Sequence, residues 1–253
     1  MQNDYPYSEP YDDELDDYDD EEEDYIDEGE DETYIAPPVR VSPLQRPSYT
    51  DPTFVYIIGL ALVLGLAPLT PANTDWRYAL AWGLLGGFSV YTWLLGRMER
   101  IEKENSQDLL WGIVFGIILG TPLLFVGGNP LQTTVQLMFR TNIEGQLLPL
   151  PPATALMLLV FVMPLAETLF FRGLMQAHRP FWMVGIAASI WSVLLLFPTL
   201  NIREFPFIAV ILGIALIMMN MLYSYVRARN GLAAAWLCQI VVNLILLFIP
   251  RLG

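Results

Sequence analysis

Residues 153–176, ATALMLLVFVMPLAETLFFRGLMQ, carry one acid and one base in an otherwise apolar run. A helix needs about 20 predominantly apolar residues to cross a hydrocarbon core about 30 Å thick, and residues 153–175 meet that length. An ionised side chain near the bilayer centre costs about 2.5–3.5 kcal/mol on insertion scales. Glu167 and Arg172 are therefore expected to face the interior of a helix bundle, a water-filled cavity or each other.

The spacing of these two residues argues against simple stacking on one helix face. Five residues correspond to about 140° of rotation on an α-helix, whereas neighbours on one face are three or four residues apart. Thr168, not Glu167, occupies the position four residues before Arg172. The sequence thus predicts that the acid and the base point in different directions.

Similar apolar runs follow one another along the chain and predict an all-α, polytopic membrane helix bundle of about seven spans. The predicted spans are residues 54–70, 78–96, 109–126, 153–175, 181–199, 206–226 and 231–249. The connection 127–152 is the longest, and its middle, residues 131–139, predicts a short interfacial helix or a re-entrant piece. Small residues on the spans suit close helix packing, among them Gly83, Gly86, Gly87, Gly116 and Gly120.

The charge is divided unevenly between the N-terminus and the apolar body. The chain is 54% hydrophobic, yet its net charge is −14. Of its 27 acidic residues, 18 lie between Asp4 and Glu32, where there is no Lys or Arg. We therefore divide the chain into a disordered acidic tail (1–35), a Pro-rich linker (36–53) and the membrane bundle (54–253). The tail is either a solvated leader or a docking segment for a basic protein surface.

The distribution of basic residues predicts a cytoplasmic N-terminus, because Lys and Arg are enriched in cytoplasmic loops. That orientation places eight basic residues inside, namely Arg40, Arg46, Arg97, Arg100, Lys103, Arg179, Arg227 and Arg229. It places four outside, namely Arg77, Arg140, Arg203 and Arg251. No secretory signal peptide is expected, since the N-terminus lacks a positive region and an apolar run. No basic stripe with interleaved aromatic residues is present, so nucleic acid is not an expected partner.

Three stretches resemble the motifs of the CAAX protease and bacteriocin-processing family of intramembrane proteases. The stretch ETLFFRGLMQ (167–176) resembles the family's E-E-x-x-x-R motif, and ASIWSVLLLFPTL (188–200) falls where the family has F-x-x-x-H. The stretch LGIALIMMNMLYSYVRARNGLAAAWLCQIVVNL (212–244) resembles the segment that leads into the third motif, a His followed four residues later by Asn or a similar residue. The resemblance covers residues 153–249. It implies glutamates and histidines that converge inside the membrane, with a glutamate activating water for peptide hydrolysis and histidines holding a metal or that water.

Some residues of these motifs are kept in this chain. Glu167 and Arg172 stand at the first glutamate and the arginine of the first motif. Trp191 stands at the aromatic position of the second motif, and Asn243 at the polar partner of the third. The resemblance thus implies Glu167, Arg172 and Asn243 as the retained site residues.

The remaining motif positions are changed. Thr168 replaces the second glutamate, Leu195 replaces the histidine of the second motif, and Gln239 replaces the histidine of the third. The whole chain has one histidine, His178, which lies about 16 Å along a continuous helix from Glu167 and is expected at the membrane edge. The single cysteine, Cys238, is expected to be a buried thiol. No metal or other cofactor is expected, although the family implies zinc or another divalent metal.

These observations favour a catalytically degenerate member of the family that acts as a binding or scaffold protein in the membrane, with another membrane protein or a basic surface as partner. The retained polar residues then form either a polar core whose groups hydrogen-bond to one another or a ligand-binding cavity. The alternative is an active intramembrane endopeptidase that cleaves membrane-associated peptides using Glu167. A solute transporter is disfavoured because the chain has no internal repeat and no paired broken helices.

Overall fold

A computed structural model of the chain describes residues 51–66, 74–95, 105–143, 146–199 and 206–252. All of them belong to the unit Pro47–Gly253. The predicted acidic tail lies outside the described residues, as does nearly all of the predicted linker. The predicted division of the chain into tail, linker and bundle therefore stays a prediction.

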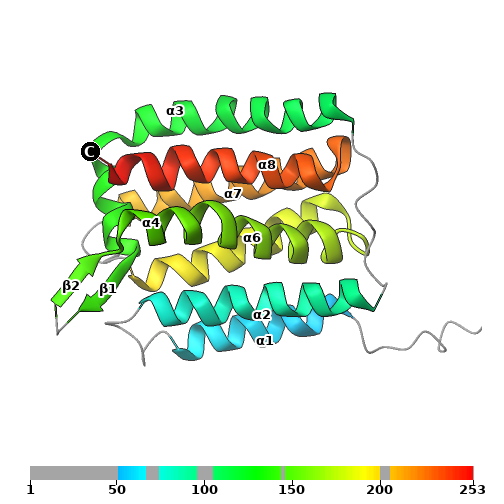
Figure 1. Ribbon diagram of the computed structural model, residues 1–253, viewed down its shortest axis with the longest axis horizontal. Coiled ribbons are helices and arrows are strands. Elements are labelled where there is room, and N and C mark those ends of the chain that lie inside the picture. The colour runs from blue at the N-terminus through cyan, green and yellow to red at the C-terminus, as the bar shows by residue number, and fades with distance from the viewer. Residues whose placement is uncertain (1–50, 67–73, 96–104, 144–145, 200–205, 253) are drawn as a thin grey trace, which may run out of the picture. The chain divides into compact units, whose positions relative to one another are not determined.

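The described residues form a bundle of helices with one small hairpin (Figure 1). The first helices are α1 (Pro52–Leu66), α2 (Thr74–Leu94) and α3 (Ser106–Met138), followed by strands β1 (Arg140–Ile143) and β2 (Gln146–Pro149). A continuous helical segment then runs from Pro152 to Met175 through α4 (Pro152–Ala155), η3 (Leu156–Val162), α5 (Met163–Glu167) and η4 (Thr168–Met175). The rest comprises α6 (Phe181–Leu196), η5 (Phe197–Thr199), α7 (Pro206–Asn230), α8 (Leu232–Asn243), η6 (Leu244–Phe248) and η7 (Ile249–Arg251).

The predicted all-α membrane bundle is confirmed. Four helical segments are long and apolar enough to cross a membrane: Ser106–Asn129, Pro152–Met175, Ala209–Asn230 and Leu232–Arg251. Two shorter apolar helices, Pro52–Leu66 and Phe181–Leu196, accompany them. Each of the seven predicted spans overlaps a described helix, while the number that cross the bilayer stays a prediction.

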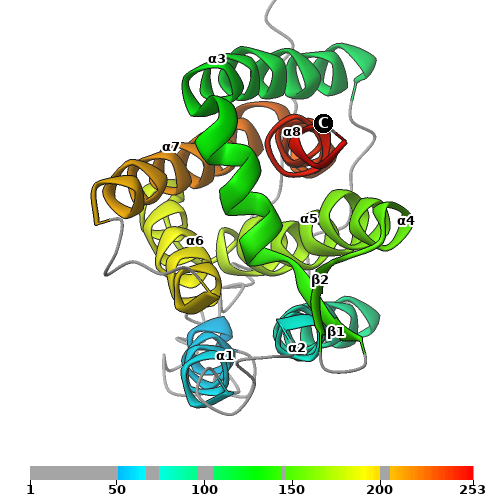
Figure 2. The same cartoon turned by 90° about the vertical axis from the view of Figure 1, so that its left-hand side faces the viewer.

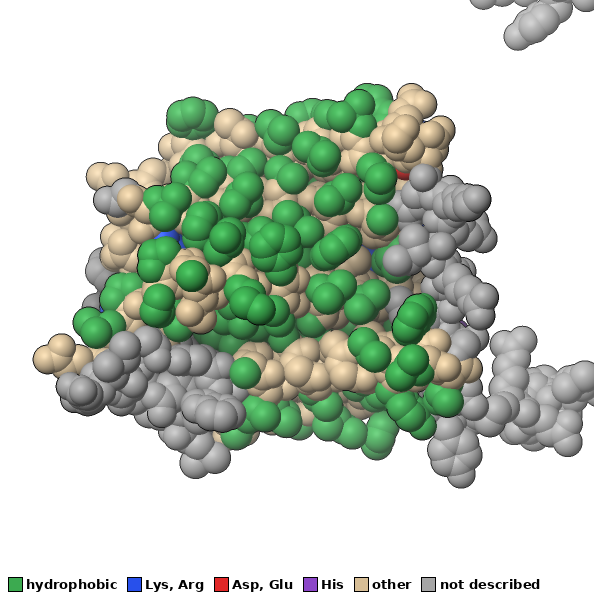
Figure 3. Space-filling view, in the orientation of Figure 1, with side chains coloured by type: hydrophobic (Ala, Val, Ile, Leu, Met, Phe, Trp, Pro, Cys, Tyr) green, Lys and Arg blue, Asp and Glu red, His purple; other side chains and the backbone are tan. Residues whose placement is uncertain are grey.

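The outer surface of the bundle is apolar, as a surface in contact with lipid must be. Hydrophobic side chains cover most of the face seen in Figure 3. Phe125 and Val126 of α3 are each 80% exposed, and Met157 and Trp93 are also well exposed. Together with the apolar helices, this surface identifies an integral membrane protein.

The predicted long connection 127–152 contains more regular structure than the sequence indicated. Helix α3 continues to Met138 across a kink at Gly128, whose φ of 44° and ψ of −136° suit glycine. Figure 2 shows the segment after this kink lying across the end of the bundle rather than along it. The β1–β2 hairpin that follows pairs Arg140 with Pro149 and Ile143 with Gln146, and no sequence signal had predicted it.

Glycines on α3 allow close approach to α8. A Cβ at Gly112 would overlap the carbonyl oxygen of Ala234 and lie 2.9 Å from its carbonyl carbon. A Cβ at Gly116 would lie 2.9 Å from Val241 Cβ, so the predicted packing role of Gly116 is confirmed.

Not every predicted packing glycine has a neighbour. A Cβ at Gly86 would lie 3.5 Å from the Cβ of Ala166, an ordinary contact. A Cβ at Gly83 or Gly87 would have nothing within 4 Å. The predicted packing role is therefore wrong for Gly83 and Gly87, because both lie on an exposed side of α2.

Candidate functional site

Glu167 lies at the end of α5, in the interior of the bundle, and is 2% exposed. Its Oε1 accepts a hydrogen bond of 3.1 Å from Trp82 Nε1 of α2. Its Oε2 accepts one of 2.7 Å from Gln239 Nε2 of α8, and Gln239 Oε1 accepts one of 2.9 Å from Thr168 Oγ1. The carboxylate is thus held between α2 and α8 by neutral N–H donors.

Arg172 lies in η4 and is fully buried. Its Nη2 donates a hydrogen bond of 2.7 Å to Asn220 Oδ1 of α7, and Asn220 Nδ2 in turn donates to Ser192 Oγ of α6 at 3.1 Å. The guanidinium carbon lies 5.7 Å from the ring centroid of Phe171 and 5.2 Å from that of Tyr223. Cation–π attraction therefore adds to the stabilisation of this charge. Within the part of the chain that the structure describes, Nε and Nη1 of Arg172 have no hydrogen-bond partner.

The predicted burial of Glu167 and Arg172 inside the bundle is confirmed, but the predicted 140° between them is wrong. The prediction assumed an α-helix, whereas η4 is a π-helix, in which hydrogen bonds join residues five apart. The bond from Gln176 N to Phe171 O, 2.9 Å long, has this spacing. The 140° of α-helical geometry therefore does not apply to this segment. The side chains of Glu167 and Arg172 bind different partners.

Asn243 is the last residue of α8 and contacts the helical segment that carries Glu167. Its Nδ2 donates a hydrogen bond of 2.8 Å to Leu159 O and approaches Met163 Sδ at 3.6 Å. Leu159 lies in the π-helix η3, and Asn243 immediately precedes the π-helix η6. Asn243 thus connects α8 to the helical segment that carries Glu167.

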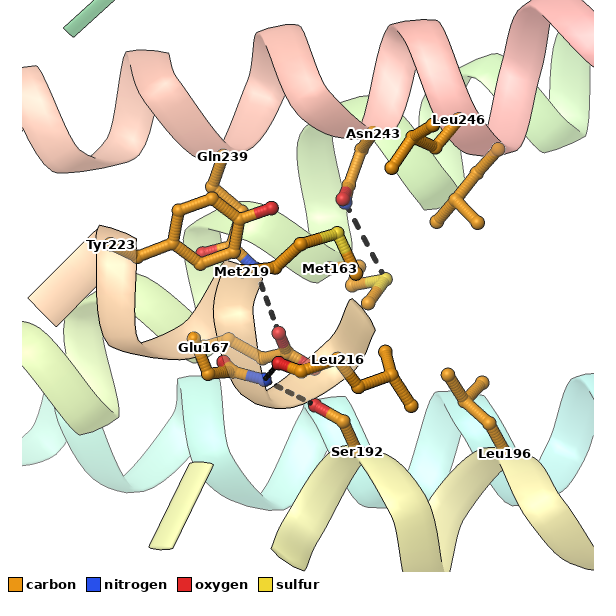
Figure 4. Close-up of a pocket in the computed structure, with 12 residues that line it drawn as sticks. Met163, Glu167, Ser192, Leu196, Leu216, Met219, Tyr223, Gln239, Asn243 and Leu246 are labelled. Carbon is orange, nitrogen blue, oxygen red and sulfur yellow. Dashed lines mark hydrogen bonds between the residues drawn. The ribbon is translucent and has the colours of Figure 1, made fainter. Parts of the chain in front are cut away.

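A cavity of about 30 Å³ lies beside these side chains (Figure 4). A space above about 10–15 Å³ can hold a water molecule when it offers polar partners, so this cavity has room for water. Glu167, Gln239 and Asn243 contribute to its wall, but Arg172 does not line it. The full lining comprises Met163, Glu167, Ser192, Leu196, Leu216, Met219, Asn220, Tyr223, Gln239, Asn243, Leu246 and Leu247.

The positions where the family motifs are changed lie at or near this cavity. Gln239 lines it, and Thr168 contacts Gln239. Leu195 is fully buried but does not line the cavity, whereas Ser192 and Leu196, three residues before it and one after it, do.

The other two residues weighed as ligands do not join the site. His178 is exposed beyond the end of η4, where its Nδ1 lies 3.0 Å from Leu174 O. Cys238 is a free, buried thiol next to Gln239 in the sequence and does not line the cavity.

The residues around Glu167 do not fit the metal ion that the family implies. Within the described part of the chain, no group of three or more His, Cys, Asp or Glu side chains lies close enough together to hold one. Both oxygens of Glu167 already accept N–H groups, and the side-chain oxygen of Gln239 accepts the Thr168 hydroxyl. Zinc prefers imidazole and thiolate ligands, and neither lines this cavity.

Three important side chains of the site were not predicted. Asn220 and Tyr223 carried a signal, since a polar amide and a hydroxyl stand within the predicted span 206–226. Trp82 carried none, because a tryptophan in an apolar helix is ordinary and its partner Glu167 is 85 residues away. Its indole N–H became recognisable only through the packing of α2 against α5 and η4.

Comparison with protein families bears on this same part of the chain. Residues 149–245 match the family model of the type II CAAX prenyl endopeptidase, Rce1-like. This region belongs to the Rce1-like family. The resemblance predicted from the three motifs is therefore confirmed, with bounds within four residues of the predicted 153–249. Comparison with curated proteins and with solved structures gave no match.

The Rce1-like region contains every motif position discussed above, but not every residue that contacts them. Trp82 lies outside residues 149–245 and donates to the carboxylate of Glu167. Tyr56 also lies outside and donates from its hydroxyl to Ala187 O of α6 at 2.8 Å. Helices α1 and α2 therefore complete the packing of the Rce1-like region.

Proposed function

We propose that this membrane protein of the CAAX protease family does not hydrolyse peptides and acts as a binding or scaffold protein. The observation that carries the proposal is the hydrogen bonding of the Glu167 carboxylate within the protein. Each of its carboxylate oxygens accepts an N–H group, from Trp82 at 3.1 Å and from Gln239 at 2.7 Å. A carboxylate held in this way serves as the centre of a polar cluster that joins helices.

The chemistry of hydrolysis supports the same conclusion. A general base must reach the proton of the attacking water within about 2.6–3.2 Å, and the oxyanion that then forms needs positioned donors or a metal. Gln239 donates to Glu167 rather than into the cavity, and Asn243 donates to a backbone carbonyl. The family's metal chemistry lacks its ligands, since Thr168, Leu195 and Gln239 stand at those positions.

Residual hydrolysis is the second candidate function, and one observation favours it. Glu167 lines a cavity with room for water, so a water molecule can lie beside the carboxylate. An intramembrane endopeptidase using Glu167 alone would activate this water without a metal. The closed hydrogen bonding of the carboxylate makes this the less favoured function.

The proposal also includes two kinds of partner, a basic protein surface and a second membrane protein. The N-terminal tail, with 18 acidic residues between Asp4 and Glu32, suits a basic protein surface. The count of basic residues favours a cytoplasmic N-terminus, which would present the tail to cytoplasmic partners. The bundle itself would bind a second membrane protein.

Proteolysis by purified protein tests the proposal. Wild type and Glu167→Gln are reconstituted in lipid vesicles and given a prenylated CAAX reporter peptide and a helical membrane peptide. We expect no cleavage above that of empty vesicles for either form. Cleavage by the wild type that is lost in Glu167→Gln would overturn the proposal and establish the endopeptidase.

Capture from native membranes tests the scaffold part. Both forms should retain the same partner in similar amount, because no substrate is turned over. Deletion of residues 1–35 should weaken capture, and unchanged capture would remove the tail from the proposal. A protein that accumulates on Glu167→Gln alone and is shortened in wild-type cells would identify a substrate instead.

A further inference from the structure

The cavity beside Glu167 is enclosed by the protein. All of its lining residues are buried except Met219 and Leu247, which are half-buried. Its volume of about 30 Å³ suits water rather than a group of a partner protein. A partner that binds at Glu167 can therefore reach it only if part of the surrounding wall moves.

The cavity is directed toward one end of the bundle. Its lining comes from α5, α6, α7 and α8, and from η6, which continues α8. Figure 4 shows Glu167 and Gln239 toward one end of the cavity, and Leu196 and Leu246 toward the other. Leu196 is the last residue of α6, and Leu246 lies in η6, near the C-terminus. The leucine end of the cavity therefore faces the end of the bundle that carries the C-terminus and the β1–β2 hairpin (Figure 1).

The segment that follows the kink in α3, residues 129–138, crosses this end of the bundle, and we call it the strap. In Figure 2 the strap runs between α6 and α7 on one side and α5 and α8 on the other, which are the helices that line the cavity. Leu131 of the strap packs against two separate clusters of buried side chains. One cluster contains Leu196 and the other contains Leu246. Leu131 thus bridges the two parts of the wall at the leucine end of the cavity.

The two ends of the strap are held differently. At its far end, Tyr78 Oη donates a hydrogen bond of 3.0 Å to Met138 O, and Arg251 Nη1 donates one of 3.5 Å to Phe139 O. Its near end begins at Gly128, which is exposed, has a φ of 44° and would have nothing within 4 Å of an added Cβ. Glycine changes its backbone torsions with little steric hindrance. The strap can thus change its course at Gly128 while its Met138 end stays in place.

We propose that the strap is a gate to the Glu167 cavity, with Leu131 as the side chain that closes it. When Leu131 withdraws from between the two clusters, the end lined by Leu196 and Leu246 opens, and a group of the partner reaches Glu167 from that end of the bundle. The inference rests on the proposed function in one respect, since a gate serves a site that takes up a ligand. It adds the route by which the ligand enters.

Thiol labelling of the purified full-length protein in detergent tests the gate. Ser192→Cys places a thiol on the cavity wall, while the native Cys238 is buried and does not line the cavity. The protein is treated with N-ethylmaleimide, and peptide mass spectrometry gives the labelling rate at each of the two positions. Adding Leu131→Ala should speed labelling at position 192 about tenfold, because the truncation removes part of the burial of a leucine from the closed state only. Labelling of Cys238 should stay unchanged, because the bundle remains folded.

Leu137→Ala is the matched control, because Leu137 is a half-buried leucine of the strap that, among the described residues, packs against neither cluster. It should leave labelling at position 192 unchanged. Gly128→Ala is a second strap variant, and it should also speed this labelling, since alanine rarely adopts a φ of 44°.

Three results would overturn the gate. The first is an unchanged rate at position 192 in Leu131→Ala or Gly128→Ala, and the second is an equal acceleration by Leu137→Ala. The third is an equal acceleration at position 192 and at Cys238, which would assign the effect to unfolding of the bundle. Peptide hydrolysis by the wild type with gated labelling would overturn the proposed function alone. Ungated labelling without hydrolysis would overturn only this inference.

Discussion

The contact between α3 and α8 gives a sharp prediction for Gly112, which lies within a helix and faces the backbone of Ala234. An added Cβ at Gly112 would lie 2.9 Å from the carbonyl carbon of Ala234, whereas carbon atoms prefer a separation of about 3.5–4.0 Å. The obstacle is backbone, which cannot rotate away as a side chain would. In Gly112→Ala the two helices must therefore separate locally by up to about 1 Å.

That separation has an estimable cost. A gap of about 0.5–1 Å already removes a quarter to a half of each dispersion contact, and overpacking of this kind costs about 1–3 kcal/mol. Alanine is favoured over glycine within a helix by about 0.5–1 kcal/mol, which offsets part of the loss. We expect Gly112→Ala to lower the free energy of unfolding by about 1–2 kcal/mol net of this offset.

Gly83→Ala is the matched control, because its Cβ would have nothing within 4 Å. It should be neutral or stabilising by up to about 1 kcal/mol. The measurement is the thermal midpoint of each purified variant in one detergent, followed by the elution profile after heating. Equal midpoints for Gly112→Ala and Gly83→Ala would refute the close approach of α3 and α8 at Ala234.

Three further predictions concern polar contacts. Asn220→Leu removes the side-chain acceptor of Arg172 and should lower the unfolding free energy by about 1.5–3 kcal/mol, measured as a lower thermal midpoint. Trp82→Phe leaves one oxygen of Glu167 without its donor and should cost about 1–3 kcal/mol in the same assay. The backbone N–H of Thr53 donates a hydrogen bond to the Asp51 carboxylate and holds the pKa of that carboxyl below its usual value. The stabilisation from ionised Asp51 should thus be complete above about pH 4 and be lost as the pH falls through the lowered pKa, and Asp51→Ala should flatten this dependence of the thermal midpoint on pH.

The tryptophan prediction has a matched control variant, and each of the other two has an outcome that would contradict it. Trp93→Phe changes an exposed tryptophan on the same helix as Trp82 and should leave the midpoint within about 0.5 kcal/mol of the wild type. A similar loss in both tryptophan variants would count against the bond from Trp82. An Asn220→Leu midpoint equal to that of the wild type would show that Asn220 does not stabilise Arg172. A pH dependence of Asp51→Ala as steep as that of the wild type would remove Asp51 from the acid response.

The sequence predicted the parts of this protein that depend on composition. Apolar length predicted the helices, and the cost of charge in lipid predicted that Glu167 and Arg172 lie inside the bundle. The family motifs predicted the region that matches the Rce1-like model. These inferences succeed because a hydrocarbon environment leaves a chain few alternatives.

Other features depended on packing that a single sequence does not reveal. The π-helical turns around Glu167 have no residue signature, so a rotation derived from α-helical geometry failed there. Gly83 and Gly87 resemble Gly116 in sequence, and only the position of α2 in the bundle leaves them exposed. Trp82 joins the site through a contact that spans 85 residues.

The order of partners along the chain bears on how the protein is made. Trp82 is synthesised before Glu167, whereas Gln239 follows 72 residues after it and Asn220 follows Arg172 by 48. At about 5–20 residues per second, Gln239 emerges from the ribosome roughly 4–14 s after the acid it binds. Helix α2, which carries the partner of the acid, is thus already synthesised when Glu167 emerges, whereas the α7 partner of the base follows 48 residues after Arg172. The order of synthesis therefore makes α2 available to Glu167 before α7 is available to Arg172.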